Sequence, residues 1–272
     1  MERITSWREF DDAVAAAASA GSDERVHSSL VFRGLARSRY SNLPSLARLG
    51  ENSARLERHL IRNFRKYAHR ERPGPTLWDW LSLAQHHGLP TRLLDWTFSP
   101  FVAAHFATAS HPEEDGVVWA VDCAAAHERL PVPLQSALHQ EGATVFTTEL
   151  LAAHAPTLDA LDHFNETEPF VLFFEPPSLD DRIVNQSAVL STMSDPCSGM
   201  DEWLDANEDL HHAWRLTPEA KADIRERLDQ ANITERVLMP GLDGLAAWLR
   251  RYYGPSLRTS SDGQEEGAAM AG

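Results

Sequence analysis

The sequence predicts an α+β fold, a single domain in which one small sheet, mixed or antiparallel, is flanked by helices. Apolar segments of strand length stand among amphipathic segments of helix length, without the regular strand–helix–strand order of a doubly wound sheet. With 43% hydrophobic and 24% charged residues in a total of 272, the composition is that of a globular protein with a sizeable core. We expect this domain to span residues 1–255 and a disordered, glycine-rich polar tail to follow at 256–272.

The first part of the chain predicts an opening helix and then a motif core at residues 28–122. The opening amphipathic helix is expected at 5–20, and a short strand at 27–34 ends in Arg33 and Gly34. The remaining elements expected here are a helix at 54–69 with an apolar stripe (Leu56, Leu60, Phe64, Tyr67), a helix at 77–87 capped by Thr76, an extended segment at 91–95, a helix capped by Ser99 with Pro100 at its first position, and a buried strand at 117–121.

The second part predicts fewer regular elements. Residues 123–168 are expected to be helical and loop-like, and the C-terminal part of the domain is expected at 169–253. Its elements are a central strand at 170–174, an alternating strand at 183–192, a helix from Thr217-Pro218 to Leu228, a strand at 233–239 and a last amphipathic helix at 242–253.

Charge is distributed unevenly along the chain. The formal net charge is −15, yet residues 33–72 contain eleven Lys and Arg against three acidic residues. Such an acidic protein does not attract nucleic acid through its net charge. The basic segment 33–72 is therefore the part expected to meet an anionic cofactor or a macromolecular acceptor, whether protein or nucleic acid. A solvated helix face, or a contact with the protein's own acidic part, is the simpler interpretation of the same charges.

Several functional classes lack their motifs. The two cysteines, Cys123 and Cys197, are far apart, which excludes a disulfide scaffold and a four-cysteine zinc site and suits a reducing cytosol. The histidine pairs do not have metal-ligand spacing, and the glycine-rich phosphate loops and the GxSxG elbow are missing. We therefore expect no bound metal. Since no apolar stretch has the length of a signal or spanning segment, we also expect no membrane partner and a cytoplasmic location.

Two polar blocks carry the candidate chemistry. Phe32-Arg33-Gly34 places an arginine at the end of an apolar strand, and residues 85–97 hold a glutamine, two histidines, an arginine, an aspartate and a tryptophan. These groups either satisfy one another in the core, for example as an Arg33–Asp95 pair, or converge on a ligand. Ser99 is read as a helix cap and Trp96 fits a core position as well as a stacking platform.

The chain resembles the FRG domain family over about residues 28–250. The resemblance is carried by Leu30-Val-Phe-Arg-Gly34, Leu43-Pro-Ser-Leu-Ala-Arg48, Gln85-His-His-Gly-Leu-Pro-Thr-Arg-Leu-Leu-Asp-Trp-Thr97, Ala103-Ala-His-Phe-Ala107 and Asp115-Gly-Val-Val-Trp119. Weaker pieces follow around Arg182–Gln186 and Met239–Ala246. The chain departs from the family after Gln186, where Ser-Ala-Val-Leu replaces the usual glycine and aromatic residue.

A remoter resemblance is to ADP-ribosyltransferases, which also begin with a strand ending in aromatic-Arg-Gly. It implies NAD as a substrate, with Arg33 on the diphosphate or ribose, Thr97 in the Ser/Thr position, and Gln186 or Glu175 in the third position. Because Gln186 is uncharged, the carboxylate would come from Glu175, Glu149 or Asp95. The residues implied to bind NAD are Arg33, Gly34, Gln85, His86, His87, Arg92, Asp95 and Trp96.

Two functions follow as expectations. The first is an NAD-dependent ADP-ribosyltransferase-like enzyme that modifies a macromolecule as a toxin or anti-phage effector, with a neutralising partner. The alternative is a non-catalytic module that senses a nucleotide or another phosphorylated ligand.

Overall fold

A computed structural model describes residues 1–20, 29–50, 52–164, 168–196 and 198–254. The start of the strand expected at 27–34, Cys197 and the tail expected at 256–272 lie outside these residues. The structure confirms a mixed sheet flanked by helices. Within the described ranges the sheet has eight strands, in the order β1-β8-β4-β2-β3-β7-β6-β5.

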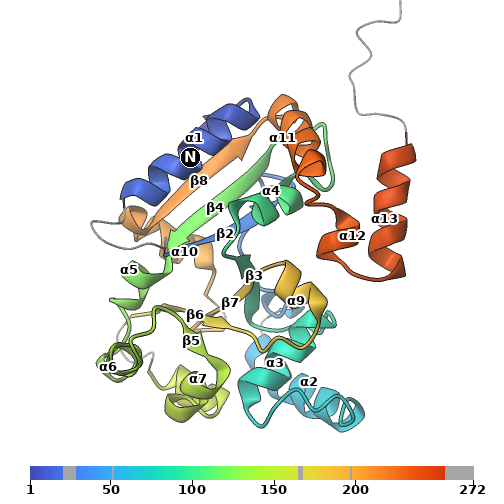
Figure 1. Cartoon of the computed structure of the whole chain (residues 1–272). Coiled ribbons are helices and arrows are strands. Elements are labelled where there is room, and N and C mark those ends of the chain that lie inside the picture. The colour runs from blue at the N-terminus through green and yellow to red at the C-terminus, as the bar shows by residue number, and fades with distance from the viewer. Residues whose placement is uncertain (21–28, 51, 165–167, 197, 255–272) are drawn as a thin grey trace, which may run out of the picture.

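One half of the sheet consists of β1 (Glu2–Ile4), β8 (His211–Leu216), β4 (Gly116–Asp122) and β2 (Leu30–Leu35). β1 and β8 are parallel, and β8, β4 and β2 pair antiparallel. One face of this half is covered by α1 (Trp7–Ala20), α4 (Pro100–Thr108) and α11 (Pro218–Gln230), as Figure 1 shows. Their apolar side chains, including Phe10, Ala104 and Ile224, pack on Phe32 and Trp214 of the strands.

The other half consists of β3 (Leu93–Thr97), β7 (Ala188–Met193), β6 (Val171–Glu175) and β5 (Phe146–Thr147). One face packs against α2 (Ser53–Tyr67), α3 (Leu77–His86), α6 (Val132–Glu141), α7 (Thr148–His154) and α8 (Leu158–Asp162). The opposite face meets α5 (Cys123–His127) and α10 (Met200–Asp205), where Trp96, Phe173 and Trp203 share a second cluster. The short 3₁₀ helices are η1 (Ala47–Leu49) and η2 (Glu208–Leu210).

The two halves are joined by a very short ladder between β2 and β3. These strands share a single register pair, Phe32 with Thr97. By contrast, β2 pairs with β4 from Leu30–Asp122 to Leu35–Val117, and β3 pairs with β7 along its whole length. The sheet therefore opens between β2 and β3 just after Phe32, at the position of Arg33.

Capping signals explain why most helices begin where the sequence predicts. Thr76 and Asp79 form a capping box at the start of α3, with the two side chains bonding each other's backbone N–H at 3.0 and 2.9 Å. The Ser99 side chain accepts a hydrogen bond from the backbone of Val102 at the start of α4, and Thr217 does the same for Ala220 in α11. The last helix, α13 (Leu242–Tyr253), also begins and ends where the sequence predicts.

Two predicted strands are wrong. The alternating segment 183–192 divides into a short helix, α9 (Asp181–Asn185), and β7, because the Asp180 carboxylate caps the backbone of Ile183 at 3.1 Å. Gln186 ends that helix rather than lying in a strand. The segment 233–239 contains the helix α12 (Glu235–Leu238), since the Leu238 N–H bonds the Thr234 carbonyl. Strands β1 and β8 were not expected from the sequence.

Among the described residues, none of the helices combines the length and apolar character needed to cross a bilayer.

His127 is built into the core as a neutral ring. Its side chain is 4% exposed, its Nδ1 lies 2.7 Å from the Thr144 carbonyl oxygen, and its Nε2 accepts the Phe173 N–H at 2.9 Å. This pair of contacts requires a proton on Nδ1 and none on Nε2. Burial away from water disfavours the charged ring and lowers the pKa of His127 to about 4.

We predict that His127 makes the fold less stable as the pH falls from 6.5 towards 4. In that window the unfolded chain binds a proton that the folded chain excludes, so the free energy of unfolding falls by up to about 1.4 kcal/mol per pH unit for this group. Urea unfolding of the wild type and of His127→Gln at several pH values measures the difference. Equal pH slopes for the two proteins would contradict the prediction.

Candidate functional site

Arg33 lies half-buried at the point where β2 and β3 separate. One terminal nitrogen of its guanidinium, Nη1, donates to the backbone carbonyl of Asp95 at 2.6 Å, and Nε donates to Asn42 Oδ1 at 3.1 Å. The side chain thus supplies β3 with a donor where the β2 backbone no longer reaches it. At this position a side-chain hydrogen bond from Arg33 replaces the backbone hydrogen bonds between β2 and β3.

Asn42 fixes the other side of Arg33. It is fully buried, its backbone N–H donates to Asp201 Oδ2 at 2.8 Å, and its Nδ2 donates to Asp201 Oδ1 at 2.7 Å. Asp201 lies in the first turn of α10. The loop after β2 is therefore anchored to a helix far along the chain.

A second set of hydrogen bonds runs from Asp95 back to the same loop. Gln85 Nε2 donates to Asp95 Oδ2 at 2.8 Å, and the Thr91 hydroxyl donates to Gln85 Oε1 at 2.5 Å. The Thr91 N–H donates to Ser45 Oγ at 3.2 Å, and the Leu46 N–H donates to the Thr91 carbonyl. We call the six residues that close this ring the Arg33 circuit: Arg33, Asn42, Ser45, Gln85, Thr91 and Asp95.

The circuit spans the sheet at the opening. Side chains two positions apart in a strand lie on the same face of the sheet. Arg33 therefore shares the face of Val31, which packs in one cluster with α10. Asp95 shares the face of Leu93, which packs in one cluster with α3. Arg33 thus lies on the α10 side of the opening and Asp95 on the α3 side. The two side chains therefore project to opposite faces of the sheet at the opening.

Charge at the site is concentrated on a few groups. Burial lowers the pKa of Arg33, and the positive charge of Arg48 lowers it further, whereas the carboxylates of Asp95 and Asp201 oppose that shift. Arg48 is exposed and makes no ion pair within the described ranges. Within the same ranges, Arg33 Nη2 and Asp95 Oδ1 make no hydrogen bond, so a donor and an acceptor remain available.

The structure brings Thr97 and Gln186 together, with both side chains already occupied. Thr97 Oγ1 donates to the Gln186 carbonyl at 2.6 Å and accepts the Ser99 N–H at 3.0 Å. Gln186 Nε2 donates to the Leu238 carbonyl at 2.8 Å. These contacts hold β3 to the turn before β7 and to α12.

Glu175 is exposed at the end of β6, where it pairs with Thr147 of β5. β7 and β3 lie between this strand and β2. Glu149 is in the first turn of α7, which follows β5. Neither carboxylate belongs to the Arg33 circuit, and of the three candidate carboxylates only Asp95 does.

Arg92 has a structural position. Its side chain is 2% exposed, its Nη2 lies 2.7 Å from Glu57 Oε2, and its Nη1 lies 2.6 Å from Asp162 Oδ1. A guanidinium so enclosed and paired ties α2 and α8 to β3 and does not reach a ligand. We assign Arg92 this role in place of the predicted NAD contact.

Trp96 and the two histidines also lie outside the circuit. Trp96 is 3% exposed, packs on Phe173 and donates its indole N–H to Ser191 Oγ at 2.9 Å, so it is a core residue. His86 Nε2 lies 2.7 Å from Asp180 Oδ2, which ties the end of α3 to the start of α9. His87 is exposed beside His86.

Gly34 sets the spacing between β2 and α4. A Cβ atom built on Gly34 would lie 1.8 Å from the backbone oxygen of Ala103. Only glycine allows the helix to lie so close to the strand. Gly34 therefore supports the site through packing rather than through ligand contact.

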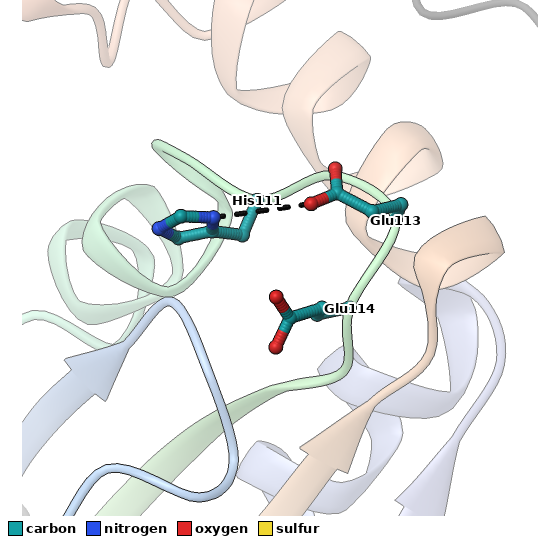
Figure 2. A group of neighbouring side chains, drawn as sticks. All are labelled: His111, Glu113 and Glu114. Carbon is teal, nitrogen blue, oxygen red and sulfur yellow. Dashed lines mark ion pairs between the residues drawn. The ribbon is translucent and has the colours of Figure 1, made fainter.

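Figure 2 shows the one histidine–glutamate group in the described ranges whose possible metal-ligand atoms all lie within 4.8 Å of one another. It consists of His111, Glu113 and Glu114, in the loop between α4 and β4. Arg37 Nη2 lies 2.8 Å from both His111 Nδ1 and Glu114 Oε1. Arg37 already occupies His111 Nδ1 and Glu114, and Arg39 Nε lies 3.3 Å from Glu114 Oε2, so we assign no metal to this group.

A cavity of about 1250 Å³ lies near α10, the start of α6 and the start of β6, with Leu130, Phe170 and Trp203 in its lining. Its lining includes none of the predicted site residues and none of the Arg33 circuit.

Sequence reasoning found Arg33, Gln85 and Asp95 but not the residues that connect them. Ser45 lies in the Leu43-Pro-Ser-Leu motif, and Thr91 lies inside the 85–97 block, so both had a local signal. Asn42 precedes the first motif directly. Asp201 had no signal, since nothing near it in sequence distinguishes it from the other acidic residues.

Comparison with known proteins identifies one family. Residues 28–116 match the family model described as FRG domain. This range contains the whole Arg33 circuit together with Gly34, Arg48 and Thr97, whereas Asp201, Gln186 and Glu175 lie beyond it. No curated protein and no solved structure matches the chain.

We predict that Gly34→Ala destabilises the protein by about 3 kcal/mol, because the added methyl meets a backbone oxygen that cannot rotate away. Gly199→Ala is the control: a Cβ there has no atom within 4 Å, and the change at a helix cap is expected to cost about 1 kcal/mol. Chemical denaturation of both variants measures the two values. A Gly34→Ala variant as stable as Gly199→Ala would show that β2 and α4 do not approach this closely.

Proposed function

We propose that this protein, which contains an FRG domain, uses NAD as a substrate and acts as an ADP-ribosyltransferase-like enzyme on a macromolecular acceptor. The observation that carries the proposal is the position of Arg33, held by hydrogen bonds at the opening of the sheet with one guanidinium nitrogen still available. The proposal also includes a cytoplasmic location and a role as a toxin or anti-phage effector with a neutralising partner.

Arg33 and Arg48 are the groups we assign to the diphosphate of NAD. Phosphate oxygens form strong, charge-assisted hydrogen bonds with guanidinium groups. Arg33 Nη2 is available, and Arg48 contributes a second positive charge without a competing ion pair within the described ranges. The circuit holds Arg33 in one orientation, which reduces the entropy lost when a ligand binds.

Asp95 is the carboxylate we assign to the reaction. Transfer breaks the bond between nicotinamide and ribose, and the bonding electron pair leaves with nicotinamide while positive charge builds on the ribose. An acceptor atom then bonds to that ribose carbon and gives up a proton. A carboxylate held nearby stabilises the developing positive charge, and Asp95 offers Oδ1 while Gln85 holds Oδ2.

In this proposal Thr97 and Gln186 support the site rather than contact the ribose. Their hydrogen bonds fix the register of β3 next to the opening and thereby the position of the Asp95 backbone carbonyl. Glu175 has no part in the proposed reaction.

The acceptor is proposed to meet the exposed basic face of α2. The helix directly follows η1, which carries Arg48. Arg58 pairs with Asp159, and Arg65 lies over the Trp80 ring at 5.3 Å. Arg55, Arg62 and Lys66 are exposed and form no salt bridge within the described ranges. An acidic protein or a nucleic acid is the class of acceptor that such a face attracts.

A second candidate is a non-catalytic sensor that binds NAD or a related phosphorylated ligand. The observation in its favour is that the Thr97 hydroxyl and the Gln186 amide are both used within the fold. Asp95 is then the one candidate carboxylate in the circuit. A sensor keeps the Arg33 contact but shows no turnover.

We predict that Asp95→Asn lowers the rate of nicotinamide release and of label transfer from NAD by about 100-fold or more, because it removes the charge that stabilises the transition state. The hydrogen bond with Gln85 survives in the amide, so folding is expected to be unchanged.

Arg33→Lys is expected to weaken NAD binding about ten- to hundredfold through loss of charge-assisted hydrogen bonds. Incubation of each purified variant with labelled NAD and cell lysate measures transfer, and thermal shift measures binding.

The matched controls are Asp11→Asn on α1 and Arg39→Lys, which pairs with Glu114 away from the circuit. Both should behave as the wild type does. NAD binding without nicotinamide release would favour the sensor. Absence of both binding and transfer, with Arg33→Lys indistinguishable from the wild type, would overturn both candidates.

We predict that the double change Arg55→Glu/Arg62→Glu weakens use of the acceptor and flattens the salt dependence of transfer, while hydrolysis of NAD in the absence of acceptor is unchanged. The reason is that log affinity for a polyanion falls with log salt in proportion to the contacts made. Initial rates at several salt concentrations measure the effect. Arg227→Glu on α11, an exposed arginine on another surface, is the control. A wild-type rate that does not respond to salt would rule out this acceptor face.

A further inference from the structure

Trp119 lies directly beside Arg33 in the sheet. The two residues are register partners in the antiparallel pairing of β2 with β4, strands that lie side by side in Figure 1. The Cβ atoms of such partners are about 4.5–5.5 Å apart, on one face of the sheet. Trp119 accordingly packs against the same cluster as Val31, on the α10 side. The indole of Trp119 and the side chain of Arg33 are therefore neighbours on that face.

Trp119 has accessible surface where the rest of its strand has none. The other five residues from Gly116 to Val121 are buried, and Trp119 alone among them is partly exposed. Its register partner on the side away from Arg33 is Ala213 of β8, whose side chain is small. The ring of His211, also on β8, lies 5.4 Å from the indole ring at an angle of 39°. These neighbours leave part of the indole open.

The indole N–H of Trp119 is enclosed by the protein, yet it makes no hydrogen bond within the part of the chain that the structure describes. By contrast, the N–H groups of Trp78 and Trp96 donate to the Ala155 carbonyl and to Ser191 Oγ. An enclosed donor without a partner is uncommon because it costs free energy. The ring nitrogens of a purine are acceptors of the kind that this N–H lacks within the fold.

The order of the strands decides which end of NAD reaches Trp119. β2 lies between β3 and β4, so Arg33 has Asp95 on the strand to one side and Trp119 on the strand to the other. In the proposed reaction Asp95 acts on the ribose that carries nicotinamide, and Arg33 binds the diphosphate. Because the diphosphate joins the two nucleosides of NAD, the adenosine then extends from Arg33 towards β4.

We propose that Trp119 is the platform on which the adenine base of NAD stacks. A base stacks on an aromatic ring when a nearby cation holds the adjoining phosphate, and Arg33 is that cation here. The inference rests on the proposed use of NAD and adds the residue that selects for the adenosine half. Trp119 lies beyond the segment 28–116 that matches the family model.

The experiment measures binding of three ligands to the full chain by titration calorimetry. Trp119→Leu is expected to weaken NAD and ADP-ribose about tenfold or more, because stacking on the indole is lost. Nicotinamide mononucleotide lacks the adenosine, so its affinity should not change. Trp119→Phe keeps an aromatic ring and should bind NAD within about threefold of the wild type.

The matched control is Trp248→Leu, which removes a partly exposed tryptophan on α13 and should bind all three ligands as the wild type does. Circular dichroism of each variant shows whether the fold is retained. A folded Trp119→Leu variant that binds ADP-ribose as tightly as the wild type would overturn the adenine platform alone. The same holds if its affinity for nicotinamide mononucleotide falls as much as its affinity for ADP-ribose.

The proposed enzyme activity can fail separately. A wild type that binds NAD and ADP-ribose through Trp119 but releases no nicotinamide would support the adenine platform and overturn the transferase in favour of the sensor. A wild type that binds neither NAD nor ADP-ribose would overturn the platform together with the proposed use of NAD.

Discussion

The opening between β2 and β3 is the constraint on which the site depends. A sheet of eight strands is interrupted near its middle, because β2 and β3 share only the Phe32–Thr97 pair. Where the backbone ladder no longer reaches, Arg33 donates a hydrogen bond to the Asp95 carbonyl through its side chain. The guanidinium joins the two halves where the backbone ladder ends, and this use of a cation concentrates charge at the same place.

The other residues around Arg33 hold its guanidinium in place and compensate its charge. A half-buried guanidinium loses hydration, as the lowered pKa of Arg33 reflects, so the carboxylates of Asp95 and Asp201 are needed to offset the loss. Asn42 and Gln85 are neutral amides that make charge-assisted hydrogen bonds: Asn42 links Arg33 to Asp201, and Gln85 donates to Asp95. Gly34 lets α4 approach β2 and so fixes the strand that presents Arg33.

The sequence predicts those helices and strands whose positions are set by residues close to them in the chain. Helix caps at Thr76, Ser99 and Thr217 act within a few residues, so α3, α4 and α11 begin where expected. The strand β8 was missed because His211-His-Ala-Trp-Arg-Leu alternates poorly, with its burial set by α1 and by its neighbouring strands. The segment 183–192 looked like one strand, yet the Asp180 cap turns its first residues into α9.

In the candidate site, too, the sequence predicts the residues with a local signal but not the contacts that form between distant segments. Arg33 and the 85–97 block stand out by residue type and short spacing, and the FRG domain match covers both. Their connections depend on tertiary structure: Asn42 and Asp201 are 159 residues apart in sequence. Spacing alone likewise does not show that Arg92 is enclosed by Glu57 and Asp162 while Asp95 remains exposed.

The single Phe32–Thr97 pair has a consequence for the matched segment itself. Residues 28–116 contain β2 and β3 but only the first residue of β4 and none of β7, the strands that flank them. Cut out alone, this stretch would hold two strands joined at one position, with both outer edges unpaired. The stretch that matches the family model therefore lacks the strands that complete its part of the sheet, because nearly all of β4 and the whole of β7 come from the chain that follows it.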